Sequence, residues 1–169
     1  PDIAYSVSYL SRFNLYSGRA HYIALLKIIK YLKSTSKHGI VFRKPDSDIV
    51  DITCYSDSDW AGGKNDRHST QGFAVLMNGN PVAWKSTKQK SCAGSSTEAE
   101  YLALSAAGTE VQWIQHVLHG MRLKTGRPMI LTVSQTSINI IKSCSAISAI
   151  RHVAQKFHNM RDLYSRRVI

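Results

Sequence analysis

Four acidic residues stand at positions from which carboxylates could hold a metal ion together. Asp57 and Asp59 lie two residues apart at the end of a predicted strand, so their side chains leave it on the same face. Glu98 and Glu100 follow about 40 residues later, in the first turn of a predicted long helix. If this helix packs on the sheet, one Asp and one Glu can converge on a hard cation such as Mg²⁺. Acidic residues at a helix N-terminus also act as caps, so both interpretations stay open.

The elements that must position these acids can be read from hydrophobic spacing and turn residues. Three strands are predicted at 49–55, 72–77 and 81–86. The step Asn78-Gly79 favours a tight hairpin turn between the last two strands. A helix over 98–118 opens with the cap residues Ser95 to Thr97. A strand and two helices follow at 129–133, 137–142 and 151–168. This order predicts an α/β domain with a mixed sheet that carries helices.

The N-terminal part of the chain has a different pattern. Residues 18–38 predict an amphipathic helix whose polar face is rich in lysine. Two roles remain open for it: an ordinary packing helix, or one that follows a phosphate backbone. Residues 39–42 form a short β-like run, and the polar turn-rich segment 44–48 indicates a boundary. We expect two units, 1–49 and 50–169.

Composition narrows the class of protein. The 169 residues carry a formal net charge of +11, which favours a polyanionic partner such as nucleic acid. Three widely spaced cysteines give neither a disulfide framework nor a zinc pattern, and an intracellular location is expected. No apolar run approaches the ~20 residues of a membrane span, so no membrane partner is expected. The chain begins without Met, and we expect it to be a piece of something longer.

Several unusual strings occur in one order along the chain. They are Tyr55-Ser56-Asp57-Ser58-Asp59-Trp60-Ala61-Gly62, then Asp66-Arg67-His68-Ser69-Thr70-Gln71-Gly72, Trp84-Lys85-Ser86 and Ser95-Ser96-Thr97-Glu98-Ala99-Glu100-Tyr101-Leu102-Ala103-Leu104. Together they resemble the ribonuclease H domain of copia-type LTR-retrotransposon polyproteins. The opening Pro1-Asp2-Ile3-Ala4-Tyr5 and Leu10-Ser11-Arg12-Phe13 are similar to the stretch that joins reverse transcriptase to that domain. The resemblance implies a ribonuclease H-like fold, a mixed five-stranded sheet flanked by helices, after a basic N-terminal helix and a thumb or connection remnant in 1–49.

The resemblance also implies a metal-dependent nuclease that cuts the RNA strand of RNA–DNA hybrids. In that family four acids hold two Mg²⁺ ions about 4 Å apart, with Mn²⁺ as a substitute. The first two acids map onto Asp57 and Glu100. The third maps onto Val133, or onto Ser134 if the match shifts by one residue, and the fourth maps onto Asn159. Two carboxylates are therefore missing, and we predict weak metal binding and weak or absent catalysis.

Two functions follow as alternatives. The first is a reverse transcriptase/ribonuclease H module with a degraded metal site, a pseudoenzyme or a weak nuclease. The second is a non-catalytic module that binds hybrid or double-stranded RNA through phosphate contacts and shape. Predicted nucleic-acid contacts are Arg67, Lys85, Lys88, Lys156 and Arg161. Partners would be a hybrid or other nucleic acid and the rest of a reverse transcriptase, in a cytoplasmic virus-like particle or in the nucleus.

Overall fold

Four strands form one mixed sheet at the centre of the protein. The computed structural model describes residues 1–63, 66–142 and 154–165, the last segment by its backbone alone up to residue 157. The sheet has the order β3-β2-β1-β4, with β1 at Ile52–Asp59, β2 at Thr70–Met77, β3 at Asn80–Lys88 and β4 at Met129–Thr132. The helices are α1 at Ala4–Ser11, α2 at Arg19–Ser34, α3 at Ser96–Gly120, α4 at Gln135–Lys142 and α5 at Ala154–Ser165.

The first three strands form the predicted antiparallel meander. Met77 pairs with Asn80, so the turn between β2 and β3 contains only Asn78 and Gly79, both with positive φ, at 48° and 76°. This is the backbone that an Asn-Gly step adopts at low cost, and it confirms the predicted hairpin. The chain then crosses over through α3 and returns as β4, which runs parallel to β1. The crossover brings the end of β4 beside the end of β1.

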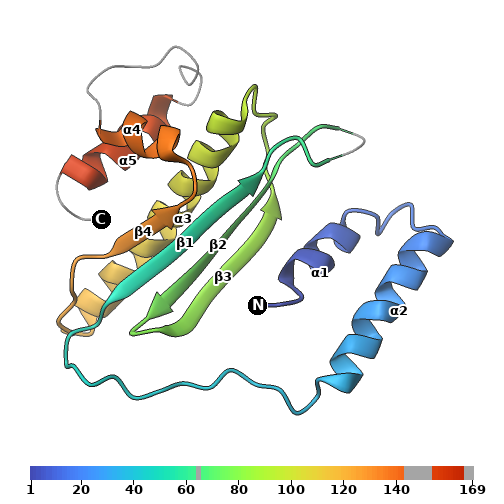
Figure 1. The fold of residues 1–169 in the computed structure, drawn as a ribbon, viewed down its shortest axis with the longest axis horizontal. Coiled ribbons are helices and arrows are strands. Elements are labelled where there is room, and N and C mark those ends of the chain that lie inside the picture. The colour runs from blue at the N-terminus through green and yellow to red at the C-terminus, as the bar shows by residue number, and fades with distance from the viewer. Residues whose placement is uncertain (64–65, 143–153, 166–169) are drawn as a thin grey trace.

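Helix α3 covers one face of the sheet, where it lies behind the strands in Figure 1. Its apolar residues recur every three or four positions and therefore form one stripe. That stripe packs on inward side chains of β1 and β2 in a core made of Ile52, Cys54, Val75, Ala107, Val111, Ile114 and Leu118. A second core joins α3 to α4 and α5, and consists of Tyr101, Leu104, Ile140, Met160 and Leu163. Helix α3 does not cover the other face of the sheet, which can therefore carry a binding site.

Three details of the predicted strands differ from the structure. The resemblance implies five strands, whereas the described residues form four. The β-like run at 39–42 is not a strand, because no neighbouring strand offers it a ladder. Strand β1 begins later than predicted and continues to Asp59, since each residue up to that point finds a partner on β2. The acidic residues of β1 therefore lie within a strand and not in the loop after it.

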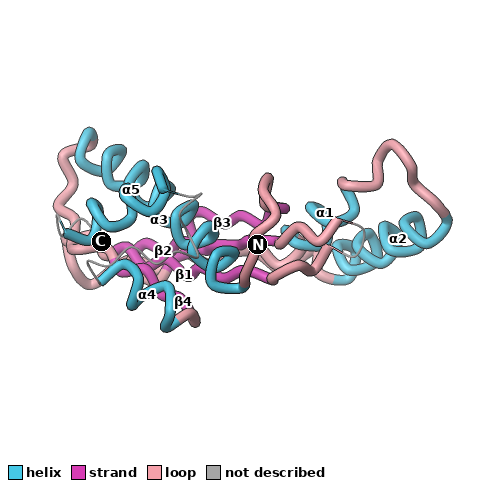
Figure 2. The backbone as a smooth tube through the Cα atoms, turned by 90° about the horizontal axis from the view of Figure 1, so that it is seen from above, coloured by secondary structure: helices cyan, strands magenta, loops and turns pink. Residues whose placement is uncertain are grey.

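The N-terminal helices lie beyond the β3 edge of the sheet, on the side opposite α4 and α5 (Figures 1 and 2). Helix α1 contacts β3, although the sequence predicted no helix there. The segment from α2 to β1 is fastened to the β2–β3 hairpin. Asn80 exchanges hydrogen bonds with the backbone of Arg43 at 2.7 and 2.9 Å, and the backbone N–H of Asp51 donates to Asn78 at 2.6 Å. Two asparagines thus hold this segment against the hairpin. No helix in the described part of the chain is long and apolar enough to cross a membrane.

Candidate nuclease site

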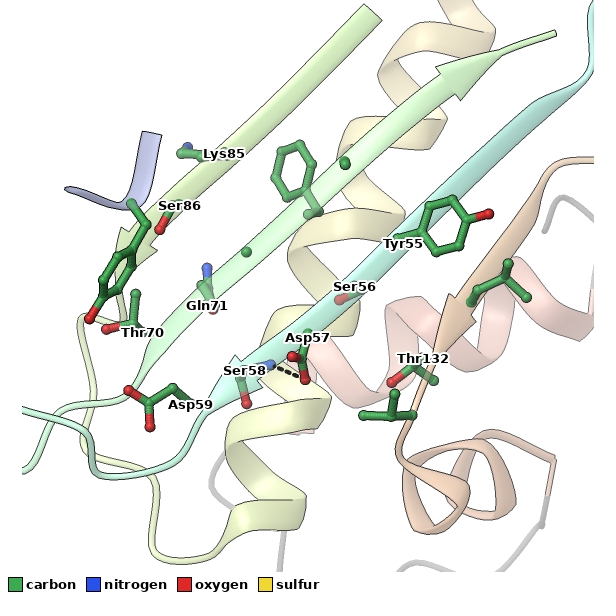
Figure 3. Close-up of a pocket in the computed structure, with 16 residues that line it drawn as sticks. Tyr55, Ser56, Asp57, Ser58, Asp59, Thr70, Gln71, Lys85, Ser86 and Thr132 are labelled. Atoms are coloured by element: carbon green, nitrogen blue, oxygen red, sulfur yellow. Dashed lines mark hydrogen bonds between the residues drawn. The ribbon is translucent and has the colours of Figure 1, made fainter. Parts of the chain in front are cut away.

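The candidate site is a groove of about 650 Å³ on the face of the sheet that α3 does not cover. Alternation along β1 buries Cys54 and Ser56 and leaves Tyr55, Asp57 and Asp59 exposed. Asp57 pairs with Gly72 of β2, so no side chain stands beside it on that strand. Figure 3 shows Asp57 on β1 between Gln71 of β2 and Thr132 of β4. The first predicted acid therefore lies at the centre of the groove.

Glu100 meets the Asp57 carboxyl group from the first turns of α3, although it does not itself line the groove. The helix begins as the sequence predicts, with the N-cap Ser95 accepting a hydrogen bond from the backbone of Glu98 at 3.2 Å. The buried Glu98 carboxylate in turn accepts from the backbone of Gly94 at 2.8 Å, so Glu98 fastens the helix start. Gln89, at the end of β3, donates a buried hydrogen bond of 2.8 Å to the carbonyl of Ala99. Gln89 therefore fixes the turn that carries Glu100, a role that nothing in its sequence context predicts.

The carboxyl groups of Asp57 and Glu100 are close enough to change each other's ionisation. Burial raises the pKa of Glu100 to about 7, and the nearby Asp57 carboxylate adds to the rise by repulsion and by hydrogen bonding. A backbone hydrogen bond from Ser58 opposes the change only in part. One oxygen of Glu100, Oε2, is buried and has no hydrogen-bond partner among the described residues. When both carboxyl groups are ionised, their negative charges repel each other. A cation bound between them would relieve this repulsion.

Val133 is the residue next to Asp57 on the other side. Ser56 pairs with Thr132 in the parallel ladder, so one residue further the chain places Val133 beside Asp57. The Val133 side chain is 81% exposed and lines the groove. Ser134 instead caps α4, because its hydroxyl lies 2.8 Å from that of Ser137 and accepts from the Ser137 backbone at 3.2 Å. The geometry thus favours Val133 over Ser134 at the position of the third acid.

Asn159 does not line this groove. It is exposed on α5 and lines a separate pocket together with Lys142, His158 and Arg161. The position of α5 is set by Met160, which packs against Gly108 on α3, two turns beyond Glu100. Of the predicted nucleic-acid contacts, Arg161 lies in this second pocket and the Lys156 side chain lies outside the described residues.

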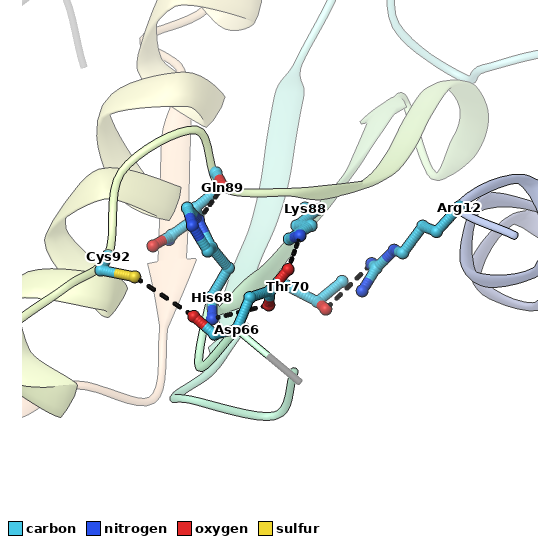
Figure 4. Close-up of polar contacts among 7 residues, drawn as sticks. All are labelled: Arg12, Asp66, His68, Thr70, Lys88, Gln89 and Cys92. Atoms are coloured by element: carbon cyan, nitrogen blue, oxygen red, sulfur yellow. Dashed lines mark hydrogen bonds and ion pairs between the residues drawn. The ribbon is translucent and has the colours of Figure 1, made fainter. Parts of the chain in front are cut away.

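The other predicted contacts lie near the β1–β2 loop or on β3. Arg67 is exposed in that loop at φ 56°, and Lys88 forms an ion pair with Asp66 that lowers the pKa of the aspartate. Lys85 lines the groove, but it pairs with Phe73, one row away from Asp57. Figure 4 shows the contacts that hold the loop. Nδ1 of His68 donates to the carbonyl of Gln89 at 2.8 Å. Gln89 therefore holds both the β1–β2 loop and the start of α3.

The sequence did not predict that Tyr5 forms part of the wall of the groove. Tyr5 of α1 lines the groove together with Gln71 and Ser86, although it lies about 50 residues before Asp57. The described residues contain no group of three or more His, Cys, Asp or Glu side chains that could share a metal. Asp57 and Glu100 are therefore the two described carboxylates available for a cation here, with Asp59 at the groove's edge. Two carboxylates fit one divalent ion better than two.

Comparison with solved structures defines the class of fold. The structure matches LC11-RNase H1, solved in complex with an RNA/DNA hybrid, with a TM-score of 0.50 and 19% sequence identity. The match covers 69% of this chain and 78% of that one. No protein-family profile matches the sequence. The chain has the ribonuclease H fold.

Sequence relatives identify the family. The Retrovirus-related Pol polyprotein from transposon RE1 of Arabidopsis thaliana is 35% identical over 163 residues, which cover 96% of this chain and 11% of that protein. The Pol polyprotein from transposon TNT 1-94 of Nicotiana tabacum is 31% identical over the same length, 96% of this chain and 12% of that protein. The chain belongs to the copia-type retrotransposon Pol polyproteins and corresponds to their ribonuclease H module. It spans about a tenth of the length of these relatives.

Proposed function

We propose that this chain binds RNA–DNA hybrids in the groove over β1, β2 and β3 and cleaves the RNA strand weakly or not at all. The observation that supports the proposal is the arrangement around Asp57, which has Glu100 close to its carboxyl group and Val133 as its neighbour in the sheet. Two carboxyl groups meet as a nuclease site of this fold requires, and the next position holds an isopropyl group with no lone pair. The known hybrid complex of LC11-RNase H1 supports the choice of ligand.

The residues present fit a single divalent cation. Asp57 and Glu100 would hold Mg²⁺ or Mn²⁺, because the buried Oε2 of Glu100 has no other described partner and its charge is unfavourable without one. Such an ion stabilises negative charge on a phosphate oxygen. The chain itself orients Asp57 through the β1 ladder, with the Ser58 backbone donating to Asp57 Oδ1 at 2.9 Å. Gln89 and Ser95 fix Glu100 by holding the start of α3.

A second metal ion would be bound by one carboxylate, that of Asp57, whereas the four-acid site of the family provides several. Loss of charge stabilisation in such sites raises the barrier by several kcal/mol, so catalysis should fall by a factor of at least roughly 10². Hybrid binding depends on phosphate contacts and on the shape of the duplex, and neither needs the missing acid. The same groove therefore also supports the second candidate function, a binding module without nuclease activity.

We further propose that residues 1–49 belong to the end of the polymerase part of such a polyprotein. The helices α1 and α2 bury none of their residues, so they do not form a core of their own. The segment holds eight basic and three acidic residues, a net +5, which suits a surface that faces nucleic acid. A reverse transcriptase is the partner that this segment implies.

The test is cleavage of a fluorescent RNA–DNA hybrid with Mg²⁺ and with Mn²⁺. We expect little or no cleavage by the wild type and a clear gain in Val133→Asp, which places a third carboxylate beside Asp57. Val41→Asp is the matched control, since it makes the same substitution at a 75% exposed valine that does not line the groove, and it should change nothing. Wild-type cleavage as fast as that of an intact ribonuclease H would overturn the catalytic part of the proposal, and so would equal effects of the two variants. Absence of hybrid binding in EDTA at low salt would overturn the binding part.

A further inference from the structure

The groove ends at a side chain that comes from outside the ribonuclease H sheet. Tyr5 of α1 lines it beside Ser86, and its side chain is 51% exposed. The row of paired residues that leads there runs from Asp57 on β1 through Gly72 on β2 to Ser86 on β3. Because Gly72 has no side chain, this row contributes just the small side chain of Ser86 between the carboxylate and the tyrosine. An extended strand can therefore pass from Asp57 to Tyr5.

The tyrosine ring is held in place by a series of aromatic contacts. Tyr5 stacks on Tyr9 with ring centroids 6.0 Å apart, and Tyr9 meets Phe13 edge to face at 5.4 Å. Phe13 then stacks on His21 of α2 at 4.1 Å. Since Tyr5 is the last ring of this series, one of its sides is left for a ligand.

Helix α1 is also fixed to the sheet. The Arg12 guanidinium lies over the Tyr9 ring at 5.3 Å and donates a hydrogen bond of 3.2 Å to the hydroxyl of Thr70, the first residue of β2 (Figure 4). Thr70 itself lines the groove. The aromatic series and this hydrogen bond together hold a half-exposed ring at the wall of the groove that contains Asp57. An aromatic ring that is already held in place binds at low conformational cost.

We propose that Tyr5 is a positioning residue that packs its ring on a sugar of the nucleic-acid strand lying in the groove. This rests on hybrid binding as proposed above and adds that residues 1–49, not the ribonuclease H sheet alone, fix where the nucleic-acid strand lies. Bases in a duplex stay paired and stacked on each other, so the accessible partner for the ring is the apolar face of a ribose or deoxyribose. The contact carries no charge and so differs from the phosphate contacts of Lys and Arg.

The test compares hybrid affinities by fluorescence anisotropy in EDTA, at several salt concentrations. Tyr5→Ala should weaken binding about five- to tenfold, through loss of the apolar ring area that packs on the sugar. Tyr5→Phe should bind within about twofold of the wild type, because the ring and not the hydroxyl makes the contact. Tyr16→Ala is the control, since Tyr16 is 89% exposed and does not line the groove. The slope of affinity against salt should stay the same in all variants.

A second measurement uses the unchanged protein, in case Tyr5→Ala destabilises α1. Nitration of tyrosines, mapped by mass spectrometry, should be slowed at Tyr5 by bound hybrid and unaffected at Tyr16. Equal affinity of wild type and Tyr5→Ala, or equal nitration of Tyr5 with and without hybrid, refutes this inference while hybrid binding itself stands. A wild type that binds no hybrid refutes the proposed function instead. A Tyr5→Phe variant as weak as Tyr5→Ala would show that the hydroxyl, not the ring, is the contact, and would also overturn the inference.

Discussion

Glu100→Gln should make the metal-free protein more stable at pH 8. Its pKa in the folded protein is about 7 against an ordinary 4.5, because burial and Asp57 disfavour the charged form. This difference corresponds to roughly 3 kcal/mol. The side chain is partly exposed, so solvent screening leaves about 1–2 kcal/mol. Glutamine keeps the shape and removes the charge, and for a chain of this size the melting temperature should rise by about 3–6 °C.

The pH dependence follows from the sign of the shift. Between pH 4.5 and about 7 the folded state binds more protons at Glu100 than the unfolded chain does, so this group lowers stability as pH rises through that window. The advantage of Glu100→Gln should therefore be full at pH 8 and vanish near pH 4. Added Mg²⁺ should stabilise the wild type at pH 8 and have little effect on the variant.

Calorimetry in EDTA at both pH values measures the effect. Glu110→Gln, a charge removal further along α3, is the control and should not reproduce the pH-dependent gain. Equal melting temperatures of wild type and Glu100→Gln at pH 8 would refute the strained carboxyl pair and, with it, the argument that a cation belongs between Asp57 and Glu100.

Three further predictions concern the parts that support the site. Gly108→Ala should destabilise the fold by about 1–3 kcal/mol in denaturant titrations, because the new Cβ would lie 2.5 Å from the Met160 sulfur. Ser95→Ala should cost about 1 kcal/mol in the same assay, through loss of the N-cap of α3; an unchanged midpoint would contradict that role. Iodoacetamide at pH 8 should label the exposed Cys92 and spare Cys54, whose pKa burial raises to about 12; mass mapping of labelled Cys54 in the native protein would contradict its burial.

Local patterns made much of the sheet and α3 predictable. The Asn78-Gly79 turn and the Ser95 cap act within a few residues, so their sequence is sufficient to predict them. The end of β1 was not predictable from its own residues. Ser56 to Asp59 are polar and turn-like, and they are extended because β2 pairs with them. Helix α1 was missed for a related reason, since it packs on β3, which lies far along the chain, and on α2.

The candidate site was predictable only in part. Resemblance to a known family selected Asp57, Glu100 and Val133. The structure places Val133 beside Asp57 in the sheet and the carboxyl group of Glu100 close to that of Asp57. It placed Asn159 in the same set, whereas in the structure Asn159 lines a separate pocket on α5. Tyr5 belongs to an opening string that resembles the stretch before the domain, but that resemblance assigns it no role in the site. Its position depends on how a separate segment packs on β3, which is a non-local property of the whole chain.

The two asparagines of the hairpin also decide which parts of the chain are joined to the same two strands. Asn78 and Asn80 hold the backbone of the segment between α2 and β1 through side-chain hydrogen bonds. The far ends of β2 and β3 carry Thr70, Gln71 and Ser86 of the groove. The N-terminal segment and the groove are therefore attached to opposite ends of one hairpin.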